Sequence, residues 1–272
     1  MKVPQRWFRL KSRSLLGLAP IFAILLVWQI LPQLKIVNPV FLPPISSILY
    51  VIYQSLATQG IRSTFVINFV FTVERAISGF LIACAIGVPL GIAIGSSKSV
   101  KRLAEPTIEI FRPLPPVVLI PFFILVFGIN QSMYLAFIAF GAIWPILVNS
   151  IDGSRGVEPQ MLDVAKVLKI NRLGRFFKIR LPASSPFIVS GMRVGLLLSL
   201  LVAVAIEMVA GHNGLGYLVI YAQEESDVKT LYAVIILMAI TGYVFNLLFV
   251  RTENYLMRWH KLFRKGIAGA QV

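Results

Sequence analysis

Long uncharged stretches divide this chain of 272 residues into apolar blocks. Residues 14–34, 76–97, 113–151 and 230–250 contain no Asp, Glu, Lys or Arg. A helix needs about 20 apolar residues to cross a hydrocarbon core of about 30 Å. Each block is therefore long enough to span a membrane, and block 113–151 is long enough for two spans. The pattern predicts a multi-pass membrane protein.

Six transmembrane helices account for the whole pattern. The predicted spans cover residues 15–34, 64–96, 104–127, 132–150, 183–209 and 230–250. We expect an all-α membrane protein in which a basic N-terminus (1–14) precedes the spanning domain (15–250). A basic tail (251–272) follows that domain, and segment 35–63 is expected to lie outside and to include a short interfacial helix.

Composition and charge support this interpretation and orient the chain. It is 57% apolar and 14% charged, whereas soluble domains average about 45–50% and about 25%. Within the net charge of +15, basic residues cluster beside span ends: five before the first span, three at 98–102, seven at 155–180 and five at 251–265. This positive-inside pattern places both termini and the 151–182 loop in the cytoplasm. It also argues against nucleic acid as a partner.

The sequence carries no motif for catalysis or for a cofactor. No lysine follows a glycine, so the phosphate-binding loop of an ATPase is absent. The two histidines, His212 and His260, have no second histidine at metal-ligand spacing. We therefore expect no metal, no cofactor and no enzymatic activity in this chain.

The 151–182 loop has the most regular pattern among the polar segments. Pro159 is expected to begin a helix there and Asn171 to end it. Apolar side chains recur at helical spacing: Leu162, Ala165 and Leu168, then Leu173, Phe176 and Phe177. Basic side chains share the other side of the second helix: Arg172, Arg175 and Lys178. The pattern predicts an amphipathic helix–turn–helix that either lies on lipid headgroups or docks to another protein.

This loop resembles the cytoplasmic "EAA" loop of permease subunits in bacterial ATP-driven importers. That pattern reads Glu-Ala-Ala, three residues, Gly, nine residues, then Ile-x-Leu-Pro. The matching positions here are Asp163, Val164 and Ala165, then Ile179, Leu181 and Pro182. Lys169 occupies the glycine position, where a left-handed turn costs a non-glycine residue roughly 1 kcal/mol or more. Asn171 is expected to form that turn instead.

Other stretches are similar to the nitrate/sulfonate/taurine/bicarbonate branch of these permeases. They are Phe111-Arg112-Pro113-Leu114-Pro115-Pro116, Leu119-Ile120-Pro121, Trp144-Pro145-Ile146-Leu147, and Glu207-Met208 before Gly211–Leu218. The resemblance implies a type I ABC importer permease fold in a bacterial inner membrane. It also implies a second permease copy, separate ABC ATPase subunits and an external substrate-binding protein.

The resemblance leaves the transported solute open. A small anion such as nitrate, bicarbonate, a sulfonate or taurine fits this branch, and so does a vitamin precursor of the thiamine-pyrimidine or riboflavin type. A secondary transporter or channel is the alternative from another class. Such a protein would normally contain an inverted repeat with matching broken helices, and we find none in the sequence.

Charged side chains inside predicted spans are costly and are usually paired or functional. The candidates are Arg75, Arg112, Arg193 and Glu207. In one interpretation they form ion pairs: Arg75 with Glu207 or Glu74, and Arg112 with Glu109 or Glu105. In the other, Arg112 and Arg193 line the transport pathway, where a guanidinium group suits an oxyanion.

Four prolines are expected to break the third span: Pro113, Pro115, Pro116 and Pro121. Broken helices persist at membrane depth where the backbone meets protein or a water-filled cavity. We therefore expect this span to line the transport pathway. The alternative is a kink that serves helix packing only.

Overall fold

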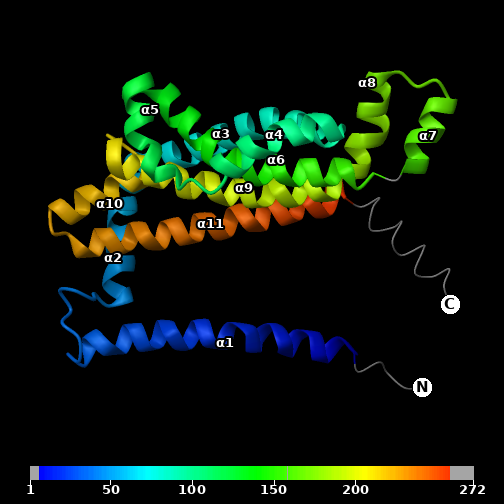
Figure 1. Ribbon diagram of the computed structural model, residues 1–272. Helices are drawn as coiled ribbons and strands as arrows, with labels where there is room; N and C mark the ends of the chain where they lie inside the picture. Colours follow the sequence, from blue (N-terminus) through cyan, green and yellow to red (C-terminus); the bar gives the residue numbers. More distant parts are fainter. Residues whose placement is uncertain (1–5, 158, 258–272) are drawn as a thin grey trace, which may run out of the picture. The chain divides into compact units, whose positions relative to one another are not determined.

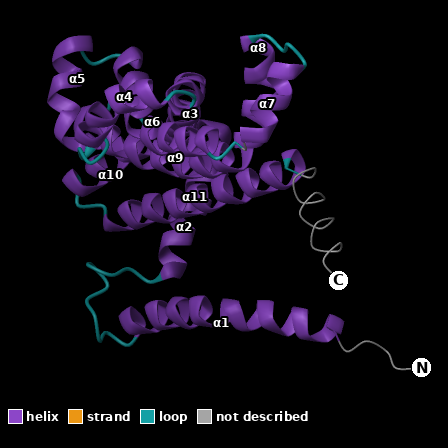
Figure 2. Cartoon of the chain, turned by 45° about the vertical axis from the view of Figure 1, so that its right-hand side comes forward, coloured by secondary structure: helices purple, strands orange, loops and turns teal. Residues whose placement is uncertain are grey.

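The computed structural model describes residues 6–157 and 159–257, and all regular elements within them are helical. They are α1 (Arg6–Gln33), α2 (Ile45–Gln59), η1 (Gly60–Arg62), α3 (Thr64–Gly95), α4 (Lys98–Phe111), η2 (Pro116–Leu119), α5 (Ile120–Phe127), α6 (Gln131–Arg155), α7 (Pro159–Val167), α8 (Arg172–Arg175), η3 (Phe176–Arg180), α9 (Leu181–Ala210), α10 (Leu215–Glu224) and α11 (Val228–Leu256) (Figures 1 and 2). The predicted all-α class is confirmed. The predicted basic N-terminus and tail lie partly outside the described residues.

Among residues 6–157 and 159–257, four helices are long and apolar enough to cross a membrane: Thr64–Gly95, Gln131–Arg155, Leu173–Ala210 and Val228–Tyr255. A fifth candidate combines α4 with η2 and α5, which are bent relative to α4 by 87°. The protein is therefore a multi-pass membrane protein. The first predicted span lies in α1, where the described apolar helix Ala19–Gln33 is shorter than the about 20 residues of a usual span. The count of six spans stays a prediction.

The described chain divides into two compact units. They are residues up to Ile67 with Leu218–Leu237, and Asn68–Tyr217 with the chain from Met238 onward. In the first unit, the side chain of Gln29 contacts the first turn of α2. Its Oε1 accepts a hydrogen bond from the backbone N–H of Ser46, and its Nε2 donates to the Ser46 hydroxyl, both at 3.0 Å. These bonds hold the start of α2 against the end of α1.

Close packing of α3, α6 and α9 forms the centre of the second unit. Small residues allow the helix backbones to approach, as is common between membrane helices. A Cβ atom on Gly191 of α9 would lie 2.7 Å from the Pro145 carbonyl oxygen, and one on Gly91 of α3 would lie 2.7 Å from the Leu147 carbonyl oxygen. Larger residues at either glycine would push α6 away from its neighbours.

The core of this unit gathers buried aromatic and aliphatic side chains from five helices. Its members include Ala76, Phe123, Phe137, Ile206 and Phe245, from α3, α5, α6, α9 and α11. Both views place α5 at one end of the unit, and α7 and α8 at the opposite end (Figures 1 and 2). α5 and the 151–182 loop therefore lie at opposite ends of this unit.

Two segments differ from the sequence prediction. The basic loop expected at 96–102 is shorter, because α4 begins at Lys98 and Ser97 caps it by accepting a hydrogen bond from the Val100 N–H at 3.5 Å. The segment between the predicted spans 183–209 and 230–250 contains the helix α10. Polar residues form the first turns of α4, whereas α10 is a mostly apolar helix outside the predicted spans.

Candidate functional site

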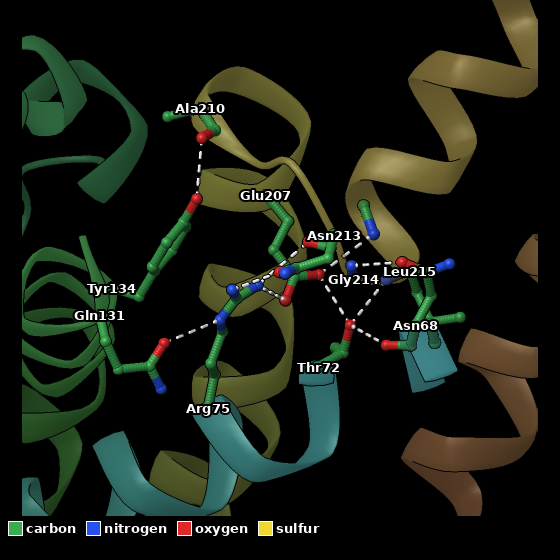
Figure 3. A network of polar contacts seen from close by, with 11 residues as sticks. Asn68, Thr72, Arg75, Gln131, Tyr134, Glu207, Ala210, Asn213, Gly214 and Leu215 are labelled. Atoms are coloured by element: carbon green, nitrogen blue, oxygen red, sulfur yellow. Dashed lines mark hydrogen bonds and ion pairs between the residues drawn. The ribbon is translucent and has the colours of Figure 1, made fainter. Parts of the chain in front are cut away.

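A buried ion pair between α3 and α9 lies at the centre of a polar network (Figure 3). Arg75 Nη1 donates to Glu207 Oε1 at 2.9 Å, and the two residues are 4% and 1% exposed. The structure thus brings together two of the four charged residues singled out in the sequence. A buried charge is costly unless it is paired and hydrogen-bonded, and the surrounding groups meet that need.

Hydroxyl and backbone donors satisfy the second oxygen of Glu207. Thr72 Oγ1 donates to Glu207 Oε2 at 2.7 Å, and the Gly216 N–H donates to the same oxygen at 3.2 Å. The Thr72 hydroxyl also accepts a hydrogen bond from the Leu215 N–H at 2.7 Å. The first N–H groups of a helix have no partner within it, so Glu207 and Thr72 together anchor the first turn of α10.

The loop between α9 and α10 wraps around the ion pair. Arg75 Nη1 donates to the Asn213 carbonyl oxygen at 3.0 Å, and the Gly214 N–H donates to Asn68 Oδ1 at 2.6 Å. Gly214 has a φ of +108°, and a Cβ atom there would collide with the carboxyl group of Glu207. This position requires glycine, both for its backbone conformation and for the close approach.

Tyr134 of α6 completes the network. The Arg75 guanidinium carbon lies 4.0 Å from the centroid of the Tyr134 ring, which is cation–π geometry. The Tyr134 hydroxyl donates at 2.8 Å to the carbonyl oxygen of Ala210, the last residue of α9. The network therefore joins α3, α6, α9 and the loop that follows α9.

Sequence analysis identified both charged members of this network but missed Asn68, Thr72 and Asn213. A partial signal exists, because residues 68, 72 and 75 share one helix face at spacings of four and three. An Asn-Gly dipeptide at 213–214 is also typical of a turn. The partners lie 132 to 146 positions apart in the chain, so no local pattern connects them.

A cavity of about 550 Å³ lies at the helix break. It is lined by Arg112, Leu114, Pro116 and Val117 of the break, by Gly141, Trp144, Pro145, Val148 and Asn149 of α6, and by Val194, Leu198, Leu201, Val202 and Ala205 of α9. Its volume is in the range of small-molecule sites, about 300–1,000 Å³. Within the described part of the chain, no group of three or more His, Cys, Asp or Glu could hold a metal ion.

The two arginines proposed for a pathway lie in different surroundings. Among the described residues Arg112 has no ion-pair partner, and Glu105, one of its expected partners, pairs with Lys101 at 3.1 Å. Arg193 Nε donates to Asn246 Oδ1 of α11 at 3.0 Å, and the described cavity wall does not include Arg193. Only Arg112 combines an unpaired charge with a place on the cavity wall.

The four prolines of the third span differ in position. Pro113 and Pro115 lie between α4 and η2, and Pro116 begins η2. Pro121 lies in the first turn of α5, where the missing N–H of proline would have no helical partner in any case. Pro121 therefore lies where α5 follows η2, and the residues between α4 and η2 are 112–115.

Lys169 forms the tight turn of the 151–182 loop. It has a φ of +51°, and the Ile170 N–H donates to the Ala165 carbonyl oxygen at 3.0 Å, as in a Schellman C-cap. The lysine at the family's glycine position therefore adopts the left-handed conformation itself. The expectation for Asn171 is wrong, because its side chain caps α8 by accepting from the Gly174 N–H at 2.7 Å.

The exposed face of α7 differs from the predicted one. Ala165 is 0% exposed and packs inside the loop, whereas Val164, Val167 and Leu168 are 58%, 80% and 66% exposed. Ala165 and Leu168 nevertheless both line one apolar groove. The groove has a volume of about 600 Å³ and lies between α7 and the helical segment that follows the turn at Lys169. Ile179 and Pro182 line the groove on the side of that segment.

The second helical segment of the loop continues into the fifth predicted span, and together they form one helix over Leu173–Ala210. Leu181 and Pro182 lie in the first turn of α9. The ring of Pro182 would crowd the Lys178 carbonyl four residues earlier, which explains the wider π-helical turn of η3. The loop and α9 are thus joined by an unbroken helix.

Residues 87–259 match the family described as binding-protein-dependent transport system inner membrane component. The chain belongs to this family. The permease is 34% identical over 241 residues to a putative ABC transporter permease protein of Methanocaldococcus jannaschii, covering 88% of this chain and 89% of that protein. It is 30% identical to the putative aliphatic sulfonates transport permease SsuC of Bacillus subtilis (87% and 84% covered) and 28% identical to the taurine transport permease TauC of Escherichia coli (94% and 93%).

The permease also shares its fold with a solved transporter. A chain of the MetNI methionine ABC transporter in an inward-facing conformation matches with a TM-score of 0.58 at 18% identity. The match covers 66% of the permease and 90% of that chain. The likeness agrees with the type I importer permease fold that the family resemblance implies.

Proposed function

We propose that this permease forms the translocation pathway of an ATP-driven importer for a small anion, in the inner membrane. Its relatives include permeases named for aliphatic sulfonate, taurine, bicarbonate and nitrate transport. The observation that carries the proposal is the unpaired guanidinium of Arg112 in the wall of a mainly apolar cavity. Arginine suits oxyanions because its N–H groups form paired hydrogen bonds to them.

The proposed assembly contains two permease copies, two ABC ATPase subunits and an external binding protein. Exposed apolar side chains on the 151–182 loop support docking of the ATPase, because such patches mark protein interfaces. They are Val164, Val167, Leu168, Leu173 and Phe177. Since the sequence lacks a phosphate-binding loop, ATP hydrolysis belongs to the partner subunit.

Uptake into proteoliposomes tests the transport function. The permease is reconstituted with an ATPase subunit and a binding protein of the same system. We expect ATP-dependent accumulation of labelled nitrate, bicarbonate or taurine. Accumulation that needs an imposed ion gradient and no ATP would contradict the proposal and identify a secondary transporter.

The docking role of the loop is tested with Val167→Glu. Val167 is 80% exposed, so the charge is tolerated by the permease fold but opposes burial against a partner. We expect loss of co-purification with the ATPase and loss of uptake, with unchanged permease yield. Ile129→Glu is the control, because Ile129 is 51% exposed in a turn outside the loop. Normal ATPase association in the Val167 variant would remove the docking role.

A further inference from the structure

A second cavity, of about 510 Å³, lies where the 151–182 loop joins α6 and α9. Its charged lining residues are Lys98, Lys101, Arg102, Arg155, Arg180 and Glu105. Five positive charges therefore face one negative charge in a confined space. Within the described chain the one ion pair of this wall joins Lys101 to Glu105, which leaves four basic groups without a carboxylate partner.

Arg180 is held in this cavity by neutral groups. Its Nη1 donates to the Ser154 hydroxyl at 3.4 Å, and its Nη2 donates to the Ser96 carbonyl oxygen at 3.5 Å. The Ser154 hydroxyl donates in turn to the Ile92 carbonyl oxygen at 3.1 Å. These contacts orient the guanidinium without neutralising it, so its charge remains available to an anion.

The cavity lies at the ends of two membrane helices and beside a third. α3 ends at Gly95 and α6 ends at Arg155, and Arg180 lies in the continuous helix Leu173–Ala210. Helix ends of this kind lie at the depth of the lipid headgroups. Basic pockets between membrane helices at this depth suit phosphate headgroups.

The cavity takes only one face of α4. Helical spacing places Lys98, Lys101, Arg102 and Glu105 on that face, whereas Val100 and Leu103, 45% and 83% exposed, lie on the opposite face of the helix. The lining of the cavity is therefore basic and polar, which suits a phosphate group more than an apolar ligand. We propose that this cavity binds the phosphate group of an anionic phospholipid at the ends of the membrane helices.

This proposal is independent of the transported solute and rests on the helix ends and the charge of the cavity. Native mass spectrometry of the full-length permease in neutral detergent tests it, with phosphatidylglycerol and phosphatidylcholine offered at equal concentration. The variant Arg102→Gln/Arg155→Gln keeps the serine contacts of Arg180. The matched control Arg62→Gln/Lys229→Gln removes the same charge from residues outside the cavity.

We expect the unaltered permease and the control to retain phosphatidylglycerol over phosphatidylcholine, and the cavity variant to bind phosphatidylglycerol about tenfold or more weakly. Equal retention by the two variants, with equal melting temperatures, would overturn the proposal. Displacement of the lipid by millimolar inorganic phosphate would show that the site takes a soluble anion instead. A cavity variant that keeps the lipid but loses the ATPase subunit would assign the basic groups to the protein interface.

Discussion

The carboxylate of Glu207 accepts hydrogen bonds from three residues in two elements. Arg75 and Thr72 lie one turn apart on α3, and Gly216 lies in the first turn of α10. A neutral side chain of the same shape would leave the buried guanidinium without a counter-charge. The network therefore depends on the charge of Glu207 as well as on its size.

Glu207→Gln tests this dependence. Breaking a buried ion pair by removing one partner costs about 3–5 kcal/mol, so we expect a large fall in the melting temperature of the purified permease in detergent. Glu74→Gln is the control, because Glu74 is an exposed neighbour of Arg75. The double variant Arg75→Met/Glu207→Met removes both charges and is expected to recover part of the loss. Equal melting temperatures for the two single variants would contradict the structural role of the pair.

Single residues show how far sequence reasoning extends. Arg75 and Glu207 were predictable as a possible pair, because charges inside apolar spans require partners. Thr72 and Asn68 were not, because neutral polar residues in a span give no comparable signal. Their importance comes from contacts with the loop after α9, which only the folded chain creates.

At the scale of elements, the turn between α7 and α8 contains a strained residue. Lys169 has the left-handed conformation, which costs an L-residue about 1–2 kcal/mol. We expect Lys169→Gly to stabilise the turn and to slow amide hydrogen exchange across residues 163–175. Lys178→Gly makes the same replacement within a helical turn, where glycine costs roughly 0.5–1 kcal/mol, and should speed local exchange. Faster exchange in the Lys169 variant would contradict this account.

Helix positions were largely predictable, and helix ends were not. Uncharged runs place α3, α6 and α11, because the membrane requires about 20 apolar residues in each. The prolines correctly mark the third span as irregular. Other features depend on helix capping and tertiary contacts, which hydrophobic periodicity does not reveal. They are the place of Pro121 in the first turn of α5, the helix α10 and the start of α4 at Lys98.

At the scale of the whole molecule, the topology of the membrane-spanning region is the main prediction left from the sequence. Reporters fused after Val272 and within residues 160–175 should both report a cytoplasmic position, and one inserted near Ser226 an external position. The reason is the clustering of basic residues on one side of the predicted spans. An external reading for either of the first two fusions, or a cytoplasmic one at Ser226, would require a different number or orientation of spans.

The second prediction at this scale concerns the transport pathway. Arg112 and Arg193 look alike in the sequence, but the structure places them in different surroundings. Arg112 lines the cavity at the helix break without an ion-pair partner among the described residues, whereas Arg193 bonds to Asn246. A hydrogen bond to a charged group contributes about 1.5–3 kcal/mol. Arg112→Ala should therefore lower anion uptake per folded permease roughly tenfold to a hundredfold.

Two further variants separate a pathway role from a structural one. Arg112→Lys keeps the charge and should restore part of the uptake, because lysine binds anions as a point charge without the guanidinium fork. Arg193→Ala loses one hydrogen bond, so we expect a lower melting temperature but normal uptake for each molecule inserted. The measurement is initial uptake rate divided by permease amount in the same proteoliposomes. If both alanine variants lose the same fraction of normalised uptake, Arg112 does not have a pathway role that Arg193 lacks. That result would contradict the assignment of Arg112 to the transport pathway.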